Sequence, residues 1–592
     1  MSYLNTPRLT FSGQFQADPS TVNNDPLHFN NETFLPSYQE YSSATDANGW
    51  WNPDGTGNWR FIGCKITSVT YQDGTSTSDP LLDPVIGMSI MDTDSRTAGK
   101  IVDLDSQQQM VSELWGLIVR IVGQDGITMM KGDYDVAPFT NIWFGRSVDL
   151  SADSAAAAIY QSVIKNITWN NGYSNSRYLN ELRAVSAKQL SIQFTLDRYN
   201  DGNTDPQFTL GRIVGSIGPS SAAEPKQFVL GRQLFPAPLP QNLPQNQNQT
   251  CNFATALVDE HLNQVVLDMG NALQFTTGGV VQETRDLRLV IDKSTAELPK
   301  NYEIIGQINY SAPNWYMGTS GICTFPLSKE QTSLAQQYPL AIMQVVNSVT
   351  TPKDVFTLKT TTTYLLQPVF TESVQYVRAD KFVFRLNPDD KCSVHFYATN
   401  LGKALPNAKI QIQDATAAFL GPTPPAVGVP KIDYFEGKKP TEIETDEHGH
   451  ATLTFTAPDP GNPRGYIDGQ VYGLSYNLST QNFATDCNQA NFISLQIYSG
   501  APKTEIAPDW DNFIQPIMQQ YANLYPLMSK GIFNLADKSV VDNNAQLLKL
   551  VFSKDLHDPN YMPATRDLSA YKQKVILDYL EAIIDKTAAS EV

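Results

Sequence analysis

Residues 190–218 read LSIQFTLDRYNDGNTDPQFTLGRIVGSIG, and this stretch shows the pattern that decides the fold class. Two runs rich in β-branched, aromatic and aliphatic residues, Leu190–Leu196 and Phe208–Ile217, flank the polar segment Asp197–Gln207. Short apolar runs separated by a segment rich in Gly, Asn and Asp are typical of two strands joined by a loop. We therefore predict a strand–loop–strand unit here.

The polar loop of this unit has several oxygen-bearing side chains around Gly202: Asp197, Asn200, Asp201, Asn203 and Asp205. Carboxylate and amide oxygens are the ligands that calcium prefers. However, the spacing lacks the distal glutamate that completes an EF-hand loop. We favour an ordinary hairpin loop over a calcium site.

The same β-type pattern extends through residues 1–374, which we predict to be one β-rich region with a few helices. Further strands are expected at Phe253–Val258 and Val265–Leu267, and the alternation returns in residues 300–374. Three segments have helical character instead: the alanine-rich Ala152–Asn166 behind Ser151, then Asn175–Ala187, and Lys329–Gln337. A Pro-, Asn- and Gln-rich segment at Phe235–Thr250 predicts an extended surface connection, so the region is either one domain or two domains that divide near residues 235–250.

Residues 375–500 have the spacing of a β-sandwich. VRADKFVFRL, KCSVHFYATN, AKIQIQD, ATLTFTAP and ISLQIYSG are short strand-like runs between turns. Asp446 and Gly449 in TDEHGHATL predict a hairpin-like turn. Together with LGKALPNAKI, this segment resembles bacterial immunoglobulin-like repeats of the adhesin and invasin kind, which implies an immunoglobulin-like β-sandwich.

The turn in that sandwich contains His448 and His450, close to Glu444 and Glu447. Residues i and i+2 share one face of a strand, so two imidazoles and a carboxylate there have the composition of a metal site. The immunoglobulin-like pattern already accounts for the segment as a turn entering a strand. We therefore assign no metal ligand.

Residues 506–592 change to a helical period and predict a small all-α domain. Phe513, Ile517, Tyr521 and Leu524 fall on one stripe of a helix. Asp567 or Ser569 is placed to cap the last helix. Such a helical domain, or the immunoglobulin-like one, is where we expect a protein partner to bind.

The overall composition excludes several classes of function. The chain has 592 residues and a net charge of −18, which argues against nucleic acid and an anionic membrane surface as partners. Its five widely spaced cysteines form no CxxC pair, so we expect reduced, mostly buried thiols. No run reaches the roughly 20 apolar residues of a membrane helix, and MSYLNTPRLTFSG lacks the features of a secretory signal. We expect a soluble, acidic protein in the cytoplasm, with non-classical export as the alternative.

Residues with chemical potential are few, and the sequence identifies no catalytic or cofactor-binding residue. The cluster Trp50, Trp51 and Trp59 is typical either of a ligand pocket, including one for a glycan, or of a loop anchored on a sheet, which we favour. The carboxylates of Asp103, Asp105 and Glu113 suit acid–base chemistry only if the fold brings them together at a cleft. No GxSxG, HExxH, P-loop or GxGxxG-before-helix motif is present.

The opening segment PRLTFSGQFQADPSTVNNDP resembles the start of the imine-dimer synthases of violacein biosynthesis. The shared positions are Pro7, Arg8, Phe11, Gly13, Thr21, Asn23, Asp25 and Pro26. The likeness continues through IVDLDSQQQMVSELWG, residues 190–218 and FATALVDEHLNQVVLDMGNAL, and so covers roughly residues 1–310. Members of that family are longer, with a ferritin-like C-terminal part, and their oxidative coupling is associated with iron or haem. The shared residues are mostly glycine, apolar and turn residues, so no catalytic residue carries over.

The C-terminal segment resembles a cytochrome c domain in DNFIQPIMQQYANLYPLM and YMPATRDLSAYKQKVILDYL, where Met562 and Pro563 match the axial-methionine segment. The CxxCH motif is absent, which excludes covalent haem attachment. We favour a helical docking domain in which Met562 is buried.

The sequence thus favours a protein of specialised, amino-acid-derived small-molecule metabolism related to imine-dimer synthases, as an accessory or degenerate member. The alternative is a non-catalytic binding or structural protein, including a particle-associated one. Immunoglobulin-like units usually provide spacing and contact surface rather than chemistry.

Overall fold

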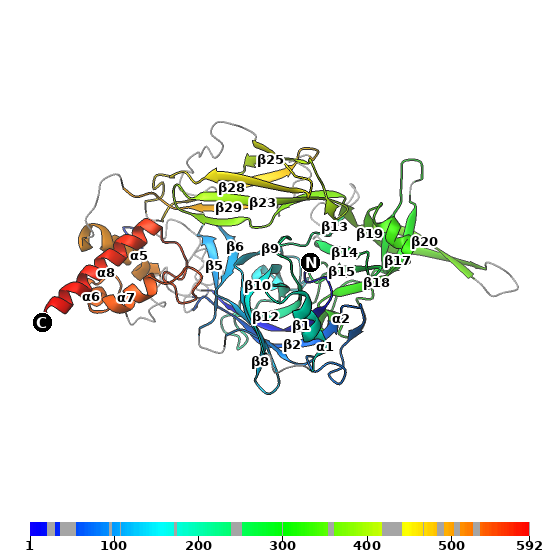
Figure 1. Ribbon diagram of the computed structural model, residues 1–592, viewed down its shortest axis with the longest axis horizontal. Coiled ribbons are helices and arrows are strands. Elements are labelled where there is room, and N and C mark those ends of the chain that lie inside the picture. Colours follow the sequence, from blue (N-terminus) through cyan, green and yellow to red (C-terminus); the bar gives the residue numbers. More distant parts are fainter. Residues whose placement is uncertain are drawn as a thin grey trace.

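The computed structural model describes residues 1–19, 30–35, 52, 55–93, 97–106, 108–170, 175–237, 251–276, 278–298, 300–352, 360–416, 441–465, 467–481, 491–502, 509–524 and 533–590. Strands dominate these residues, and the longest helix lies at the C-terminal end (Figure 1). The mainly β fold class is therefore confirmed, including a two-sheet sandwich and a small helical C-terminal part.

Eight antiparallel strands of the first sheet close into a ring, because β1 pairs with both β2 and β12. In spatial order the ring strands are β1 (Arg8–Asp18), β12 (Leu210–Pro219), β11 (Leu190–Asp197), β10 (Ala157–Trp169), β8 (Thr128–Tyr134), β7 (Ile118–Val122), β4 (Ser89–Met91) and β2 (Asn58–Thr70). Outside the ring, β3 (Ser76–Thr77) pairs with β2, while β5 (Gly99–Asp105), β6 (Gln108–Trp115) and β9 (Ala137–Trp143) run from β2 to β10. The predicted strand–loop–strand unit at residues 190–218 is the β11–β12 hairpin.

Aromatic side chains fill the interior of the ring. Trp59 is fully buried, with its ring 4.9 Å from that of Phe61 and 5.4 Å from that of Phe194 between centroids. Tyr160 lies 5.5 Å from Phe194 on the same measure. Edge-to-face and tilted ring pairs of this kind stabilise a core beyond the area that they bury. The ring therefore encloses a packed core.

The helix predicted over Ala152–Asn166 is wrong. Only Ala152–Ala155 form a short 3-10 turn, Ser151 makes no side-chain capping bond, and β10 begins at Ala157. Strand β10 pairs with β11, β8 and β9, and this tertiary pairing outweighs the helical propensity of the alanines. The helix predicted over Asn175–Ala187 is confirmed as α1 (Arg177–Val185), whose Leu179 amide donates to the Ser176 side chain.

The second sheet has eight antiparallel strands and lies beside the ring (Figure 1). In spatial order they are β17 (Tyr302–Gln307), β16 (Leu287–Asp292), β19 (Leu340–Pro352), β20 (Thr360–Ser373), β13 (Arg232–Pro236), β14 (Ala254–Asp259), β15 (Gln264–Asp268) and β18 (Ile322–Pro326). Two short helices accompany it, α2 (Trp315–Thr319) and α3 (Lys329–Ala335), and the second confirms the helix predicted near residues 329–337. The predicted extended connection is partly wrong, since Phe235 and Pro236 end β13 and pair with β20. Residues 238–250 of that connection lie outside the described part of the chain.

The described residues between 375 and 497 form a sandwich of two sheets around one apolar cluster. One sheet contains β21 (Gln375–Ala379), β23 (Lys391–Asn400), β24 (Lys403–Ala404) and β27 (His450–Thr456). The other contains β22 (Val383–Leu386), β29 (Phe492–Ile497), β28 (Gln470–Leu478), β25 (Lys409–Asp414) and β26 (Thr441–Glu444). The turn at Asp446–Gly449 therefore connects strands of two different sheets, and it is held by a hydrogen bond from the Gly449 amide to the Asp446 carbonyl.

The described C-terminal residues contain four α-helices, with a non-helical stretch between the last two. A π-helical turn, Trp510–Ile514, leads into α5 (Gln515–Leu524), followed by α6 (Lys538–Asn543), α7 (Ala545–Phe552) and α8 (Ala570–Ser590). Ile517 and Tyr521 are buried in their common core as the stripe predicts. Among these helices and the others described, none has the length and hydropathy to cross a membrane. The boundaries of the domains at residues 374/375 and 500/506 stay a prediction.

Candidate functional site

An open cleft lies where the ring meets the second sheet, and it is large enough for a metabolite. Its volume is about 880 Å³, within the usual range of ligand pockets. Its walls come from β1, β2 and β3 on one side, and from α2 and β18 on the other. Helix α2 contacts β1, β2 and β18, and these four elements lie near one another in the lower middle of Figure 1.

Alternation along β1 sets one wall of the cleft. Leu9 and Phe11 are fully buried in the core of the ring. Arg8, Thr10 and Ser12 alternate with them along β1 and therefore belong to the other face of the strand. The sequence RLTFS thus places apolar and polar side chains on opposite sides. Arg8, Thr10 and Ser12 all line the cleft.

A β-bulge adds hydroxyl groups to this wall. Thr10 is opposite Ser68 and Phe11 is opposite Ile66, so the register leaves Thr67 as the extra residue of β2. The Thr10 hydroxyl oxygen consequently lies 2.7 Å from that of Ser68 and 3.0 Å from that of Thr67.

Helix α2 closes the other side of the cleft and is fixed to the ring. The Thr67 hydroxyl donates to the Gly318 carbonyl at 2.8 Å, and the buried Ser320 hydroxyl donates to the Gly215 carbonyl at 2.7 Å. Both residues that flank α2, Asn314 and Ser320, have φ near +60°. Such left-handed residues let the chain enter and leave a five-residue helix abruptly.

The lining of the cleft is rich in hydroxyls and has one charged side chain. About half of the lining residues are Ser or Thr, mostly from β1 and from the segment between Thr67 and Ser78. Met317, Ile66 and Ile322 provide an apolar part. Among the described lining residues Arg8 alone is charged. The cleft can therefore bind a small polar molecule through hydrogen bonds, with one cationic point.

A second cavity is too small to be a ligand site. It lies between the ring, the second sheet and β21, lined among others by Tyr3, Gln161 and Asn271, with a volume of about 20 Å³. This is roughly the room needed by one water molecule. The Gln161 and Asn271 side chains have buried polar atoms without a protein partner in the described structure, which fits a water-sized space.

Two of the three carboxylates that we considered for acid–base chemistry, those of Asp105 and Glu113, connect the ring region to the sandwich instead. Asp105 binds Arg464 through two hydrogen bonds of 2.8 and 2.9 Å, and both side chains are nearly fully buried. Glu113 forms a buried ion pair with Arg385. Asp103 accepts a hydrogen bond from Ser112, its partner across β5 and β6. These arginines come from the sandwich, so the carboxylates hold the two parts together.

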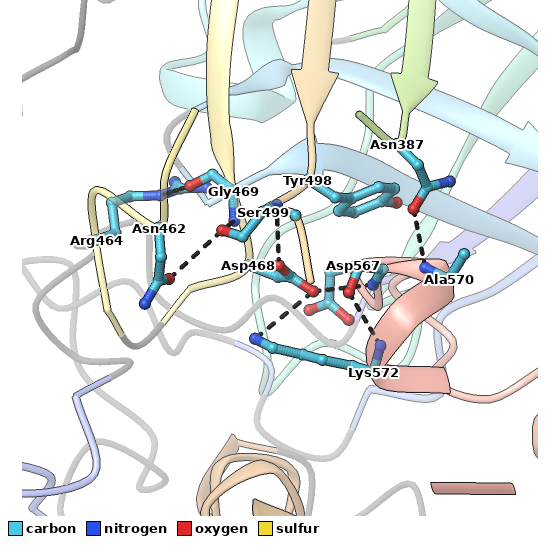
Figure 2. Close-up of polar contacts among 12 residues, drawn as sticks. Asn387, Asn462, Arg464, Asp468, Gly469, Tyr498, Ser499, Asp567, Ala570 and Lys572 are labelled. Carbon is cyan, nitrogen blue, oxygen red and sulfur yellow. Dashed lines mark hydrogen bonds and ion pairs between the residues drawn. The ribbon is translucent and has the colours of Figure 1, made fainter. Parts of the chain in front are cut away.

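A related set of contacts attaches α8 to the sandwich, and Figure 2 shows it around Asp468. One carboxylate oxygen of Asp468 accepts from the Ser569 amide at 2.9 Å and lies 3.6 Å from the Lys572 ammonium. The other accepts from the Ser499 amide at 3.3 Å. Of the two predicted caps, Ser569 holds the start of α8 by accepting from the Lys572 amide, whereas Asp567 accepts from the Tyr521 hydroxyl.

The structure does not support either of the two metal sites that we considered, the loop around Gly202 and the turn with His448 and His450. Asp197 is buried and pairs with Arg212 and Arg146, so its oxygens are bound to arginines. The imidazoles of His448 and His450 lie 6.2 Å apart, and Asp446 accepts from the amides of both residues. No group of three or more His, Cys, Asp or Glu in the described ranges is arranged to hold a metal ion.

The remaining candidates are also placed by the structure. Trp59 lies in the core of the ring, and Trp50 and Trp51 lie outside the described residues. Met562 is partly buried against the apolar cluster of the C-terminal helices. Cys64, Cys251, Cys323 and Cys392 form no disulfide in the described structure, and Cys323 is the least buried of these four. Cys487 lies outside the described residues.

Arg8 and the hydroxyls around it are the functional candidates that our sequence reasoning did not select. A signal was present, because Arg8 belongs to the opening motif of the resemblance and residues 67–78 read TSVTYQDGTSTS. The sequence could not show that this stretch faces α2 and β18, more than 230 residues further along the chain.

Two known proteins are similar in sequence to part of this chain. The chain is 34% identical over 147 residues to the 2-imino-3-(indol-3-yl)propanoate dimerase of Chromobacterium violaceum, covering 24% of this chain and 13% of that protein. It is 25% identical over 186 residues to the dichlorochromopyrrolate synthase of Lentzea aerocolonigenes, covering 29% of this chain and 18% of that protein. Each match thus spans less than a fifth of the relative's length. No protein-family model matches the chain.

Solved structures similar to the chain are distant. The D0–D1 domain of intimin matches with 14% identity and a TM-score of 0.14, covering 41% of this chain and 93% of that one. The fibronectin(III)-like modules of Clostridium thermocellum CbhA match with 7% identity and a TM-score of 0.12, covering 41% and 89%. TM-scores this low establish no shared architecture for the chain as a whole. The relatives and structures give no support to the cytochrome c resemblance of the C-terminal segment.

Proposed function

We propose that this protein acts in specialised metabolism by binding an amino-acid-derived small molecule in the hydroxyl-lined cleft between the ring and the second sheet. The observation that carries the proposal is the cleft itself, which has a metabolite-sized volume and polar walls with one buried cation. The two proteins that match part of the chain also support a role in specialised metabolism, since one acts on an imino acid and the other makes a dichlorochromopyrrolate. A cytoplasmic location is part of the proposal, supported by the four described cysteines, which form no disulfide.

A panel of ligands tests this proposal on the full-length protein. The panel contains 2-oxo acids, imines freshly generated from aromatic amino acids by an amino-acid oxidase, and N-acetylated amino acids. Binding is measured by thermal shift and native mass spectrometry, and products are followed by chromatography. We expect at least one member to bind. A protein that binds none of these compounds and leaves the imines unchanged contradicts the proposal.

Two matched serine variants locate the binding. Ser76 lines the cleft on β3 and lies 3.0 Å from the Thr70 hydroxyl, while Ser393 is an exposed strand residue of the sandwich 3.3 Å from the Thr454 hydroxyl. Replacing Ser76 with tryptophan fills part of the cleft and should abolish binding. The same change at Ser393 should leave binding unaltered. Equal behaviour of the two variants would show that the ligand binds elsewhere.

The alternative is a non-catalytic interaction protein that binds a partner through the sandwich or the C-terminal helices. It is favoured by the use of Asp105 and Glu113 for ion pairs with Arg464 and Arg385 rather than for a reactive site. Affinity capture with the full-length protein distinguishes the two proposals. A stoichiometric protein partner, together with no small-molecule binding, supports the alternative.

A further inference from the structure

We propose that Arg8 is the anion-binding residue of the cleft and that the ligand is a small carboxylic acid with further hydrogen-bonding groups. The inference rests on the proposed function, because it assumes that the cleft binds a small molecule. It adds the chemical class of that molecule and the residue that recognises it.

Arg8 is a buried cation without a nearby counter-charge. It is only 4% exposed. One terminal nitrogen donates to the Leu4 carbonyl at 3.1 Å and the other to the Thr324 hydroxyl at 2.9 Å. Both acceptors are neutral, and no carboxylate of the described residues lies within the 4.0 Å of an ion pair with Arg8.

Among the deeply buried arginines that have no ion pair in the described structure, Arg8 lines the cleft, whereas Arg378 and Arg566 do not. Two further buried arginines have a different arrangement. Arg232 and Arg464 are equally buried, and each forms a close pair with an acidic side chain, Glu372 and Asp105 respectively. A buried charge is costly unless it is paired. The structural role of Arg8, tying the N-terminal loop to β18, uses two of the five N–H groups of a guanidinium and supplies no negative charge.

Burial also affects the acidity of Arg8. It lowers the pKa of the guanidinium to about 10, and the more distant Asp259 and Tyr178 oppose this effect. Arg8 therefore remains a cation at neutral pH, with N–H groups left for an acceptor at the cleft. A guanidinium binds carboxylate in a planar, charge-assisted and often bidentate manner, which makes a carboxylate a suitable counter-charge.

The other lining residues define the rest of the ligand. The described lining contains no acidic side chain that would repel an anion. The hydroxyls of Thr10, Thr67 and Ser68 both donate and accept, and they suit amide, imine, hydroxyl or carbonyl groups on the ligand. Met317 is half-buried at the cleft and offers contact to one apolar group. An N-substituted or oxidised amino acid combines these features.

The test uses two probes of nearly the same shape, N-acetyl-L-phenylalanine and its neutral carboxamide, with inorganic phosphate as a third. Dissociation constants are measured calorimetrically on the full-length protein. We expect the acid to bind roughly 10- to 100-fold more tightly than the carboxamide, since a hydrogen bond to a charged group contributes about 1.5–3 kcal/mol. Equal affinities of the two organic probes would overturn the inference without any variant. Phosphate that binds while the acid does not would overturn the assignment to carboxylates.

Variants of Arg8 locate the effect. The Arg8→Gln change should remove the preference for the acid while changing the affinity for the carboxamide by no more than about twofold. The control is Arg288→Gln, the same change at an arginine of β16 that does not line the cleft, and it should retain the preference. If the Arg8→Gln variant still prefers the acid, Arg8 is not the anion-binding residue, although the proposal that the cleft binds a small molecule still stands. Binding of no panel compound at all contradicts the proposed function as well.

If Arg8→Gln does not fold, Arg8→Lys serves in its place. It keeps the charge and loses the planar, bidentate geometry, so we expect a preference for the acid that is reduced but present. A lysine variant with an unchanged preference shows that bidentate recognition by Arg8 is not involved.

Discussion

Asp103 is the residue whose surroundings have the clearest pH consequence. Removal from water raises the pKa of its carboxyl group to about 7, although the Ser112 hydrogen bond and the nearby Arg385 act in the opposite direction. An unfolded aspartate has a pKa of about 3.9. Between about pH 4 and pH 7 the folded state therefore holds a proton that the unfolded state has lost. Consequently, this group lowers the stability of the protein as the pH rises through that window.

We predict that Asp103→Asn becomes increasingly stabilising relative to the wild type as the pH rises from about 4.5 to 8. The amide cannot ionise, and its oxygen still accepts a hydrogen bond from Ser112. The measurement is the free energy of urea unfolding of both proteins across this range.

The control is a variant of Asp537, whose effect on stability should change with pH in the opposite direction. Hydrogen bonds from Ser539 and Val540 at the start of α6 lower the pKa of Asp537. Its stabilising contribution is present above the unfolded pKa and is lost as the pH falls, so any deficit of Asp537→Asn should shrink below about pH 4. A stability difference between Asp103→Asn and the wild type that does not change with pH contradicts the prediction.

The residue types in the sequence pointed to the buried carboxylates but not to the partners that these carboxylates bind. Asp103, Asp105 and Glu113 stood out in the sequence as carboxylates, yet the partners of Glu113 and Asp105, Arg385 and Arg464, lie more than 270 residues away. Only the fold decides whether such carboxylates face a cleft or an arginine. Arg8 was visible as a motif residue, but its isolation from acidic groups depends on which strands surround it.

The attachment of α8 is the element-scale feature with the sharpest consequence. We predict that Asp468→Ala loosens the start of α8 because the Ser569 amide and Lys572 lose their shared acceptor. Leaving such groups unpaired costs about 1–3 kcal/mol. Hydrogen exchange should therefore accelerate in residues 569–576.

A control exists in the same helix. Asp578 and Lys574 form an exposed pair at positions i and i+4, so Asp578→Ala should destabilise the helix clearly less than Asp468→Ala does. If the two variants exchange alike, the contact of Asp468 with α8 does not anchor the helix.

Elements were predictable where local pattern and tertiary pairing agree. The β11–β12 hairpin, α1, α3 and the apolar stripe of α5 follow from period, turn residues and caps. Segment 152–166 shows the opposite case, because its alanines favour a helix while three neighbouring strands pair with β10. VRADKFVFRL shows another limit, since this single run is divided between β21 and β22 in different sheets.

At the scale of the whole molecule, buried ion pairs join regions that are far apart in the sequence. We predict that Arg464→Met and Asp105→Asn each destabilise the protein by about 3–5 kcal/mol, because each change leaves one buried partner without its counter-charge. The double variant should cost clearly less than the sum of the single ones. Chemical unfolding of the four proteins gives this double-mutant cycle.

An exposed pair provides the comparison. Lys409 and Glu442 pair across β25 and β26 on the sandwich surface, and their cycle should show a much weaker coupling, because water screens an exposed pair. Additive effects of Arg464→Met and Asp105→Asn would mean that this contact does not couple the sandwich to the ring region.

The closure of the ring also constrains how the protein is made. Strand β1 ends at Asp18, but one of its two partners, β12, is complete only at Pro219. A nascent chain leaving the ribosome thus exposes one unsatisfied edge of its first strand during the synthesis of about two hundred residues. Contacts this distant in sequence form slowly, and open strand edges invite aggregation. Chaperone supply during translation, more than the stability of the finished protein, is therefore expected to limit the yield of recombinant material.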